Sequence, residues 1–231
     1  MTPLLTAPPS PHRTDAPDPP APAPKPRLRG WLHAATTPLV LAASIVVLTL
    51  ADGPGAKAAM AVYLATSLIL FGTSAAYHIG HWSPHVTAVL RRIDHSNIFL
   101  FIAGTYTPLS VLLLTGASRV ALLSVIWSAA VAGCCFRILW LGAPRWLYVC
   151  LYIVMGWTAI WWMPQLWASG GPAVVGLVLA GGVAYSLGAL VYARRWPNPI
   201  PRWYGFHEVF HSATILAAAC HFTAIALAIV R

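Results

Sequence analysis

The stretch GFHEVFHSATILAAACHFTAIALAIV, residues 205–230, decides the fold that the sequence predicts. Most of it is apolar, and about 20 such residues are enough to cross a bilayer as a helix. The stretch opens with His207, Glu208 and His211, which together form the pattern His-Glu-x-x-His. In a soluble helix this spacing is typical of a zinc metalloprotease. Here the same residues begin a hydrophobic segment, so a metal site at a membrane edge is a second interpretation.

The composition of the whole chain is that of a membrane protein. Of its 231 residues, 58% are hydrophobic and 8% are charged, whereas soluble domains contain about 25% charged residues. So few charges cannot cover a surface that faces water. The net charge of +9 does not indicate a nucleic-acid partner, because the basic residues lie between apolar runs and act as topology signals. Membrane lipids are the expected partners.

The chain divides into two regions. Residues 1–29 hold ten of the twenty prolines and lack the apolar core of a signal peptide, so we expect a disordered cytoplasmic tail. Residues 30–231 form the expected membrane domain. The four cysteines all lie inside apolar segments and are expected to be small buried residues without disulfides.

Seven apolar segments predict an all-α bundle of seven transmembrane helices. They cover residues 32–50, 58–77, 95–114, 119–140, 146–163, 173–192 and 207–230. With the N-terminus in the cytoplasm, eleven of the fourteen basic residues fall on the cytoplasmic side. This bias predicts a cytoplasmic N-terminus and an outside C-terminus, in a multi-pass protein of the bacterial inner (plasma) membrane.

Histidines and a carboxylate gather at one predicted depth, near the inner leaflet. His78 ends the second span, Asp94 opens the third, and His207 and His211 open the seventh. His207 and His211 are four residues apart, so they share one helix face and can share a metal ion. The three histidines therefore predict an open zinc site, which leaves a fourth position for water or a carboxylate.

Asp94 and Ser74 are the predicted catalytic residues of this site. Asp94 would hold the water, bind the metal weakly or orient a histidine; alternatively it is the N-cap of the third span or pairs with Arg91 or Arg92. Ser74 lies four residues before His78, so its hydroxyl is expected one turn deeper in the membrane. A role in helix packing is the alternative for Ser74.

These residues resemble a known family motif. Ser74-x-x-x-His78, then Asp94, then His207-x-x-x-His211 is similar to the motif set of the progestin and adipoQ receptor superfamily. GTYTP (104–108), FHEVFH (206–211) and CHF (220–222) resemble its bacterial branch, hemolysin III. The resemblance covers about residues 25–230 and implies seven transmembrane helices with a cytoplasmic-side Zn²⁺ site, whose ligands would be the three histidines. The motif of the first span is matched only by His33.

The remaining histidines and the glutamate have simpler interpretations. Glu208 is expected to be incidental, and His33 to pack or to make a supporting hydrogen bond in preference to binding metal. His81 and His85 are expected in a loop, since Trp82-Ser83-Pro84 separates them. His221 lies too far along the last span to join the site. A metalloprotease would need a third metal ligand, and no suitable one follows His211 in the sequence.

Three functions remain open for such a site. The first is a zinc-dependent hydrolase that cleaves an amide or ester bond of a lipid. The second is a non-enzymatic, receptor-like regulator in which zinc ties the helices together. The third is pore formation and cytolysis, as the name of the branch implies, although no span has a polar stripe to line a pore. All three place the protein in membrane or lipid biology, with no role in binding nucleic acid.

Overall fold

The structure is a computed structural model that describes residues 25–140 and 142–231. Every regular element in these residues is a helix. They are α1 (Trp31–Leu50), α2 (Gly53–Ile79), α3 (Pro84–Leu113), α4 (Gly116–Leu139), α5 (Arg145–Gly156), the 3₁₀ helix η1 (Thr158–Trp162), α6 (Met163–Arg194) and α7 (Phe206–Ile229). The predicted disordered tail lies largely outside the described residues.

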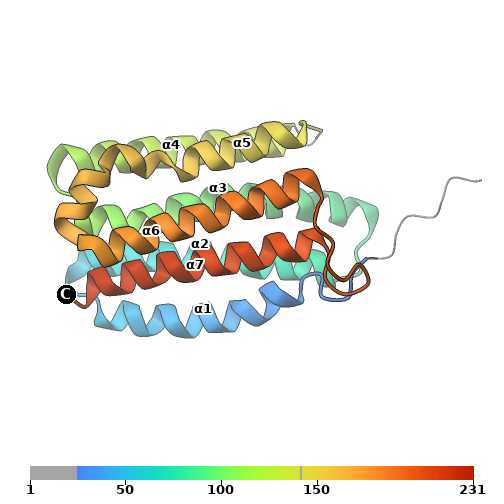
Figure 1. Cartoon of the computed structure of the whole chain (residues 1–231), viewed down its shortest axis with the longest axis horizontal. Helices are drawn as coiled ribbons and strands as arrows, with labels where there is room; N and C mark the ends of the chain where they lie inside the picture. Colours follow the sequence, from blue (N-terminus) through green and yellow to red (C-terminus); the bar gives the residue numbers. More distant parts are fainter. Residues whose placement is uncertain (1–24, 141) are drawn as a thin grey trace, which may run out of the picture.

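The helices lie side by side along the long axis of the molecule, and neighbours in sequence run in opposite directions (Figure 1). In the part of the chain that the structure describes, six helical segments are long and apolar enough to cross a membrane: α1, α2, α3, α4, the stretch Arg145–Arg194 and α7. Large apolar side chains such as Leu39, Val120 and Leu139 are exposed, as expected where lipid covers the surface. The chain is therefore a helical, multi-span membrane bundle.

The stretch from Arg145 to Arg194 is less regular than the sequence predicts. α5 has only 12 residues, and η1 follows it before α6 begins. The Tyr106 hydroxyl bridges this break, because it donates to the Gly156 carbonyl at 2.7 Å and accepts from the Ala159 amide at 2.8 Å. The sequence predicts that the sixth segment begins at residue 173, but α6 begins at Met163 and has a kink instead, where Gly171 has φ 67° and ψ −179°.

The third helix begins earlier than the sequence predicts. Ser83 is its N-cap and Pro84 its first residue, a position where proline is well tolerated because the first amide has no partner inside the helix. The prediction that His85 lies in a loop is therefore wrong, since His85 is in the first turn of α3, whereas His81 does precede the helix. Asp94 lies inside α3 and is not its cap.

α3 is the most buried span, with 67% of its apolar window inside the bundle. Its register against α2 is held by two contacts. Asn97 donates to the Thr73 hydroxyl at 2.7 Å, and Gly104 packs directly against Thr66, where an added Cβ would lie 1.9 Å from the hydroxyl oxygen. This register brings Asp94 of α3 level with the end of α2, where His78 lies.

Candidate metal centre

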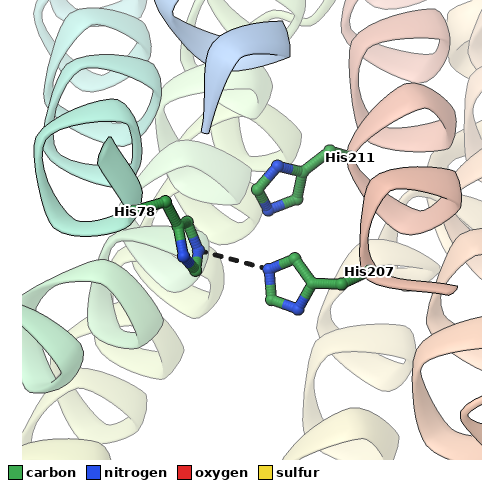
Figure 2. Close-up of side chains that lie close together, drawn as sticks. All are labelled: His78, His207 and His211. Atoms are coloured by element: carbon green, nitrogen blue, oxygen red, sulfur yellow. Dashed lines mark hydrogen bonds between the residues drawn. The ribbon is translucent and has the colours of Figure 1, made fainter. Parts of the chain in front are cut away.

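The three predicted histidines converge at one end of the bundle. His78 is in the last turn of α2, and His207 and His211 are in the first two turns of α7. Figure 2 shows their rings pointing toward one another across the gap between the two helices. One ring nitrogen from each lies within 4.8 Å of the other two. We call the end of the bundle that holds them the histidine end.

The geometry of this group suits a metal ion. The Nε2 atoms of His78 and His207 are 3.2 Å apart, and two nitrogens bound to one tetrahedral zinc are about 3.3 Å apart, given Zn–N bonds of about 2.0–2.1 Å. His211 Nδ1 is buried and has no hydrogen-bond partner among the described residues. Three neutral imidazoles that face one space are a typical donor set for a divalent transition metal. The group could therefore hold such an ion.

His33 supports the site without joining it. Its ring stacks on the ring of His211, with centroids 3.8 Å apart and planes 8° apart, and it meets Phe71 edge-on. Both of its ring nitrogens are buried and unpaired within the described chain. A ring that lies face to face with a ligand presents no lone pair to the same ion, so the stack limits how the His211 ring can rotate.

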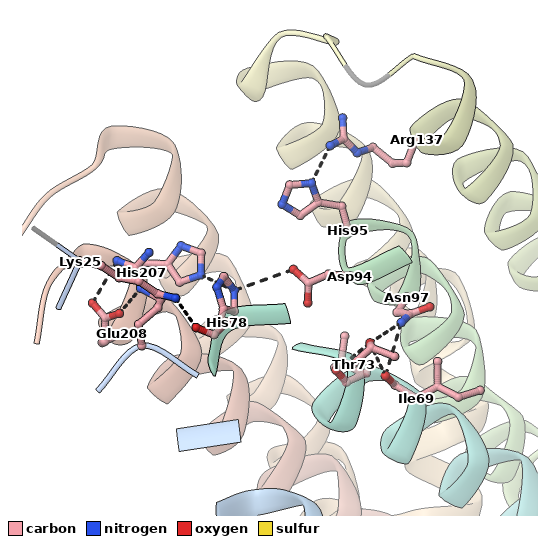
Figure 3. A network of polar contacts seen from close by, with 12 residues as sticks. Lys25, Ile69, Thr73, His78, Asp94, His95, Asn97, Arg137, His207 and Glu208 are labelled. Atoms are coloured by element: carbon pink, nitrogen blue, oxygen red, sulfur yellow. Dashed lines mark hydrogen bonds and ion pairs between the residues drawn. The ribbon is translucent and has the colours of Figure 1, made fainter. Parts of the chain in front are cut away.

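Asp94 lies next to the histidines but does not contact them directly. Its Oδ2 atom is 4.0 Å from His78 Nε2, which is too long for a hydrogen bond and leaves room for a bridging ligand. Figure 3 shows the carboxylate directed at His78 from α3. Asp94 and Ser74 line one cavity together with His33, His207 and His211, so the structure brings both predicted catalytic residues to the site.

A second, apolar cavity borders this one. The two cavities share Leu70, Ile98, Tyr152, Ala189, Phe210 and Thr214 as lining residues. The apolar cavity runs among α3, α5, α6 and α7, from Ile98 past Tyr106 to Met163. Space lined by aliphatic and aromatic side chains is suited to a hydrocarbon chain. The site therefore opens toward the interior of the bundle as well as toward its end.

Glu208 points away from the metal centre. Its carboxylate is completely buried, forms an ion pair with Arg29 and accepts the Gly205 amide at 2.9 Å. It therefore caps the start of α7, where the helix dipole favours a negative charge. The expectation that this glutamate is incidental to the metal is consistent with this placement.

Sequence reasoning missed how residues 25–29 dock on the bundle. The Arg27 and Leu28 amides donate to the carbonyls of Arg202 and Trp203 at 3.0 and 3.2 Å, in the loop before α7. Lys25 donates to the His78 carbonyl, and partial burial together with nearby Arg29 lowers the pKa of the Lys25 ammonium. The basic cluster was visible in the sequence, but nothing local showed that Arg29 would reach a carboxylate 179 residues away.

His221 has a separate role on α7. Its Nε2 atom lies 3.0 Å from the Val178 carbonyl of α6, and its ring fills the space above Gly181, where an added Cβ would lie 2.3 Å away. This placement agrees with the prediction that His221 lies too far along the last span to join the site. It also confirms that the motif CHF (220–222) contributes no ligand to the three-histidine group.

The fold and the site define a class: a multi-span helical membrane protein with a buried three-histidine group that could hold a metal ion. The family described as "Haemolysin-III related" matches residues 22–222. The chain belongs to this family.

Two curated bacterial relatives match part of the chain. "Hemolysin-3" of Bacillus cereus is 35% identical over 137 residues, which cover 59% of this chain and 62% of the relative. "Hemolysin-3 homolog" of Bacillus subtilis (strain 168) is 37% identical over 134 residues, which cover 58% of this chain and 60% of the relative. The matched region therefore spans less than two thirds of either relative.

Proposed function

We propose that this protein is a zinc-dependent hydrolase that cleaves an amide or ester bond of a membrane lipid. The observation that carries the proposal is the position of Asp94: a buried carboxylate directed at three convergent histidines, in a cavity that borders an apolar one. A structural metal site needs no such carboxylate beside an open position. A lipid fits both cavities, with its chain among apolar side chains and its polar bond near the histidines.

His78, His207 and His211 would hold the ion. Zinc bound in such a site supplies Lewis acidity and an activated water. Asp94 would act as the general base and take up a proton at Oδ2, and the Ser74 hydroxyl would donate a hydrogen bond to an oxygen of the reacting group. The apolar cavity would hold the acyl chain and keep bulk water from the bond that is cleaved.

We further propose that the chain crosses the membrane seven times, with α5 and η1 together as the fifth crossing. The N-terminus would be cytoplasmic and the C-terminus outside, in the plasma membrane of a bacterium. The distribution of basic residues supports this orientation. Within residues 25–140 and 142–231, Lys25, Arg91, Arg145, Arg194 and Arg202 lie at the histidine end, and only Lys57, Arg119 and Arg231 lie at the other. The metal centre would then face the cytoplasm.

Reporter fusions test the orientation. Alkaline phosphatase joined after Arg231 is expected to be active, because it folds only outside the cytoplasm, and a green fluorescent protein at the same point should stay dark. The reverse pattern would contradict the outside C-terminus and, because the C-terminus lies at the end opposite the histidines, the cytoplasmic metal centre.

The hydrolase is tested with an Asp94→Asn variant, and Asp52→Asn is the matched control at the opposite end of the bundle. Purified protein in lipid nanodiscs is given an N-acyl amide lipid and an ester lipid, and released fatty acid is measured together with zinc content. Asp94→Asn should lower turnover by about 100-fold or more while zinc stays bound. Unchanged turnover in this variant would contradict the mechanism.

A zinc-loaded wild-type protein that cleaves neither lipid would favour the receptor-like regulator instead. The names of the two relatives also raise cytolysis. Release of a dye from liposomes that contain the purified protein would support pore formation, and tight liposomes with measurable lipid turnover would support the hydrolase.

A further inference from the structure

A third cavity at the histidine end is lined by positive charge. It has a volume of about 570 Å³ and opens to the surface beside His78 and His207. No carboxylate lines it among the residues that the structure describes. Five basic side chains surround it: Lys25, Arg29, Arg91, Arg137 and Arg145.

Arg137 is the unusual member of this set. It lies in the last turn of α4 and is only 2% exposed. Its Nη2 atom is 2.7 Å from His95 Nδ1, and its guanidinium carbon lies 4.3 Å from the centre of the Tyr148 ring. Its Nε and Nη1 atoms are buried and have no hydrogen-bond partner in the described part of the chain. Neither contact supplies a negative charge.

An arginine that acts only as a topology signal would extend into water. Arg137 is instead buried, and a buried guanidinium that lacks a counter-ion is strongly disfavoured. The carbonyls at the end of α4 offer part of a negative charge, but they leave two guanidinium nitrogens unpaired. These nitrogens lack an acceptor among the described residues, and Arg137 lines the cavity, which has room for one.

The other basic residues are partly engaged. Arg145 donates to the Tyr192 carbonyl at 3.1 Å and lies over the Tyr192 ring. Because neither partner carries a full negative charge, the charge of Arg145 stays unneutralised. Arg29 pairs with Glu208. Arg91 is exposed, and the two ion pairs found in the described residues leave Arg91, Arg137 and Arg145 without a carboxylate partner.

We propose that this cavity binds a phosphate-type oxyanion, and that the oxyanion is the headgroup phosphate of an anionic lipid held beside the metal centre. Arg137 would donate to the phosphate through its guanidinium N–H groups, whose charge no carboxylate of the described chain neutralises. Arg91 and Arg145 would add charge from the two sides.

The location explains why a lipid phosphate fits better than a free anion. Asp94 and His95 are consecutive residues of α3 that face different partners: Asp94 is directed at His78, and His95 at Arg137 (Figure 3). The phosphate beside His95 would thus lie next to the metal centre beside Asp94. The apolar cavity would hold the acyl chains of the lipid. That this lipid is the substrate rests on the proposed hydrolase, whereas its binding does not require turnover.

Binding is measured with full-length protein in an uncharged detergent, from the shift in melting temperature as ligand is added. The probes are dihexanoyl phosphatidic acid, dihexanoylglycerol, which has the same chains and no phosphate, and inorganic phosphate. Phosphatidic acid is expected to bind more tightly than either of the others. Equal binding of dihexanoylglycerol would overturn the phosphate site, and equal binding of inorganic phosphate would overturn the lipid as its source.

The variant that tests the site is Arg137→Gln, and Arg119→Gln at the other end of α4 is its control. Loss of a charge-assisted pair should weaken phosphatidic acid at least about tenfold in Arg137→Gln and leave Arg119→Gln unchanged. If Arg137→Gln does not fold, Arg91→Gln, an exposed position, should weaken the same ligand. Unchanged affinity in a folded Arg137→Gln, or in Arg91→Gln when that is the variant used, would overturn the proposal.

The Asp94→Asn variant separates this inference from the proposed function. It should bind phosphatidic acid as the wild type does, even if no variant or wild-type protein hydrolyses any lipid. Binding of phosphatidic acid without turnover of any lipid would remove the hydrolase and keep the anion site, and lipid turnover without binding of phosphatidic acid would do the reverse.

Discussion

Arg29 and Glu208 form an ion pair in which the glutamate carboxylate is completely buried. The pair joins the segment before α1 to the first turn of α7, immediately beside His207. It also turns the only glutamate of the His-Glu-x-x-His pattern away from the three histidines. In the structure the pattern therefore consists of two histidines that face His78 and one carboxylate that pairs with Arg29 and caps the start of α7.

Glu208→Gln should destabilise the fold and leave the metal in place. The amide can still cap Gly205, but the partly buried charge of Arg29 loses its partner, so we expect the free energy of unfolding to fall by about 1–3 kcal/mol. Thermal melting in detergent measures the loss, and elemental analysis measures zinc. The double variant Arg29→Gln/Glu208→Gln should lose less stability than the two single variants lose together. A well-folded Glu208→Gln that has lost its zinc would show that the glutamate serves the metal.

Removing any one of the three histidines should remove the metal. His78→Ala, His207→Ala and His211→Ala each delete a proposed ligand. The affinity for zinc should therefore fall further than it does when a residue that only supports a ligand is changed, which is by about 10–100-fold. Metal content and titration with zinc give the measurement. His221→Ala on α7 and His81→Ala in the α2–α3 loop are the controls, and both should bind zinc normally. Full zinc content in His207→Ala would contradict the proposed ligand set.

His33 is expected to act through packing. His33→Phe keeps a flat ring against His211 and should retain zinc, whereas His33→Ala opens a gap and should weaken zinc about tenfold by freeing the His211 ring. Zinc titration of the two variants separates the roles. Equal and complete loss of zinc in both would identify His33 as a fourth ligand.

Gly104 is expected to be irreplaceable because α2 and α3 touch there. A Cβ at this position would lie 1.9 Å from the Thr66 hydroxyl oxygen, whereas one at Gly72 of α2 would meet nothing within 4 Å. Gly104→Ala should therefore lower stability by about 1–3 kcal/mol and shift Asp94 relative to His78. Gly72→Ala should be neutral or slightly stabilising. Melting temperatures of the two variants test this, and equal values would contradict the close contact.

The helical membrane architecture could be predicted from the sequence because its cause is local. Runs of apolar residues must be helical in a bilayer, since each backbone amide has to find its partner within the segment. The spacing of His207 and His211 fixes their common face for the same reason. With alternating helix directions, the ends that carry His78 and His211 had to meet at one end of the bundle.

The contacts around the site depend on tertiary packing. How far each helix is rotated about its own axis decides that Asp94 faces His78 while its neighbour His95 faces Arg137. Helix hydropathy is nearly uniform around these spans, so it does not specify that rotation. The rotation is specified by close contacts between residues far apart in the chain, such as Gly104 against Thr66 and Arg29 against Glu208. Only the assembled bundle provides the shape and charge for these contacts.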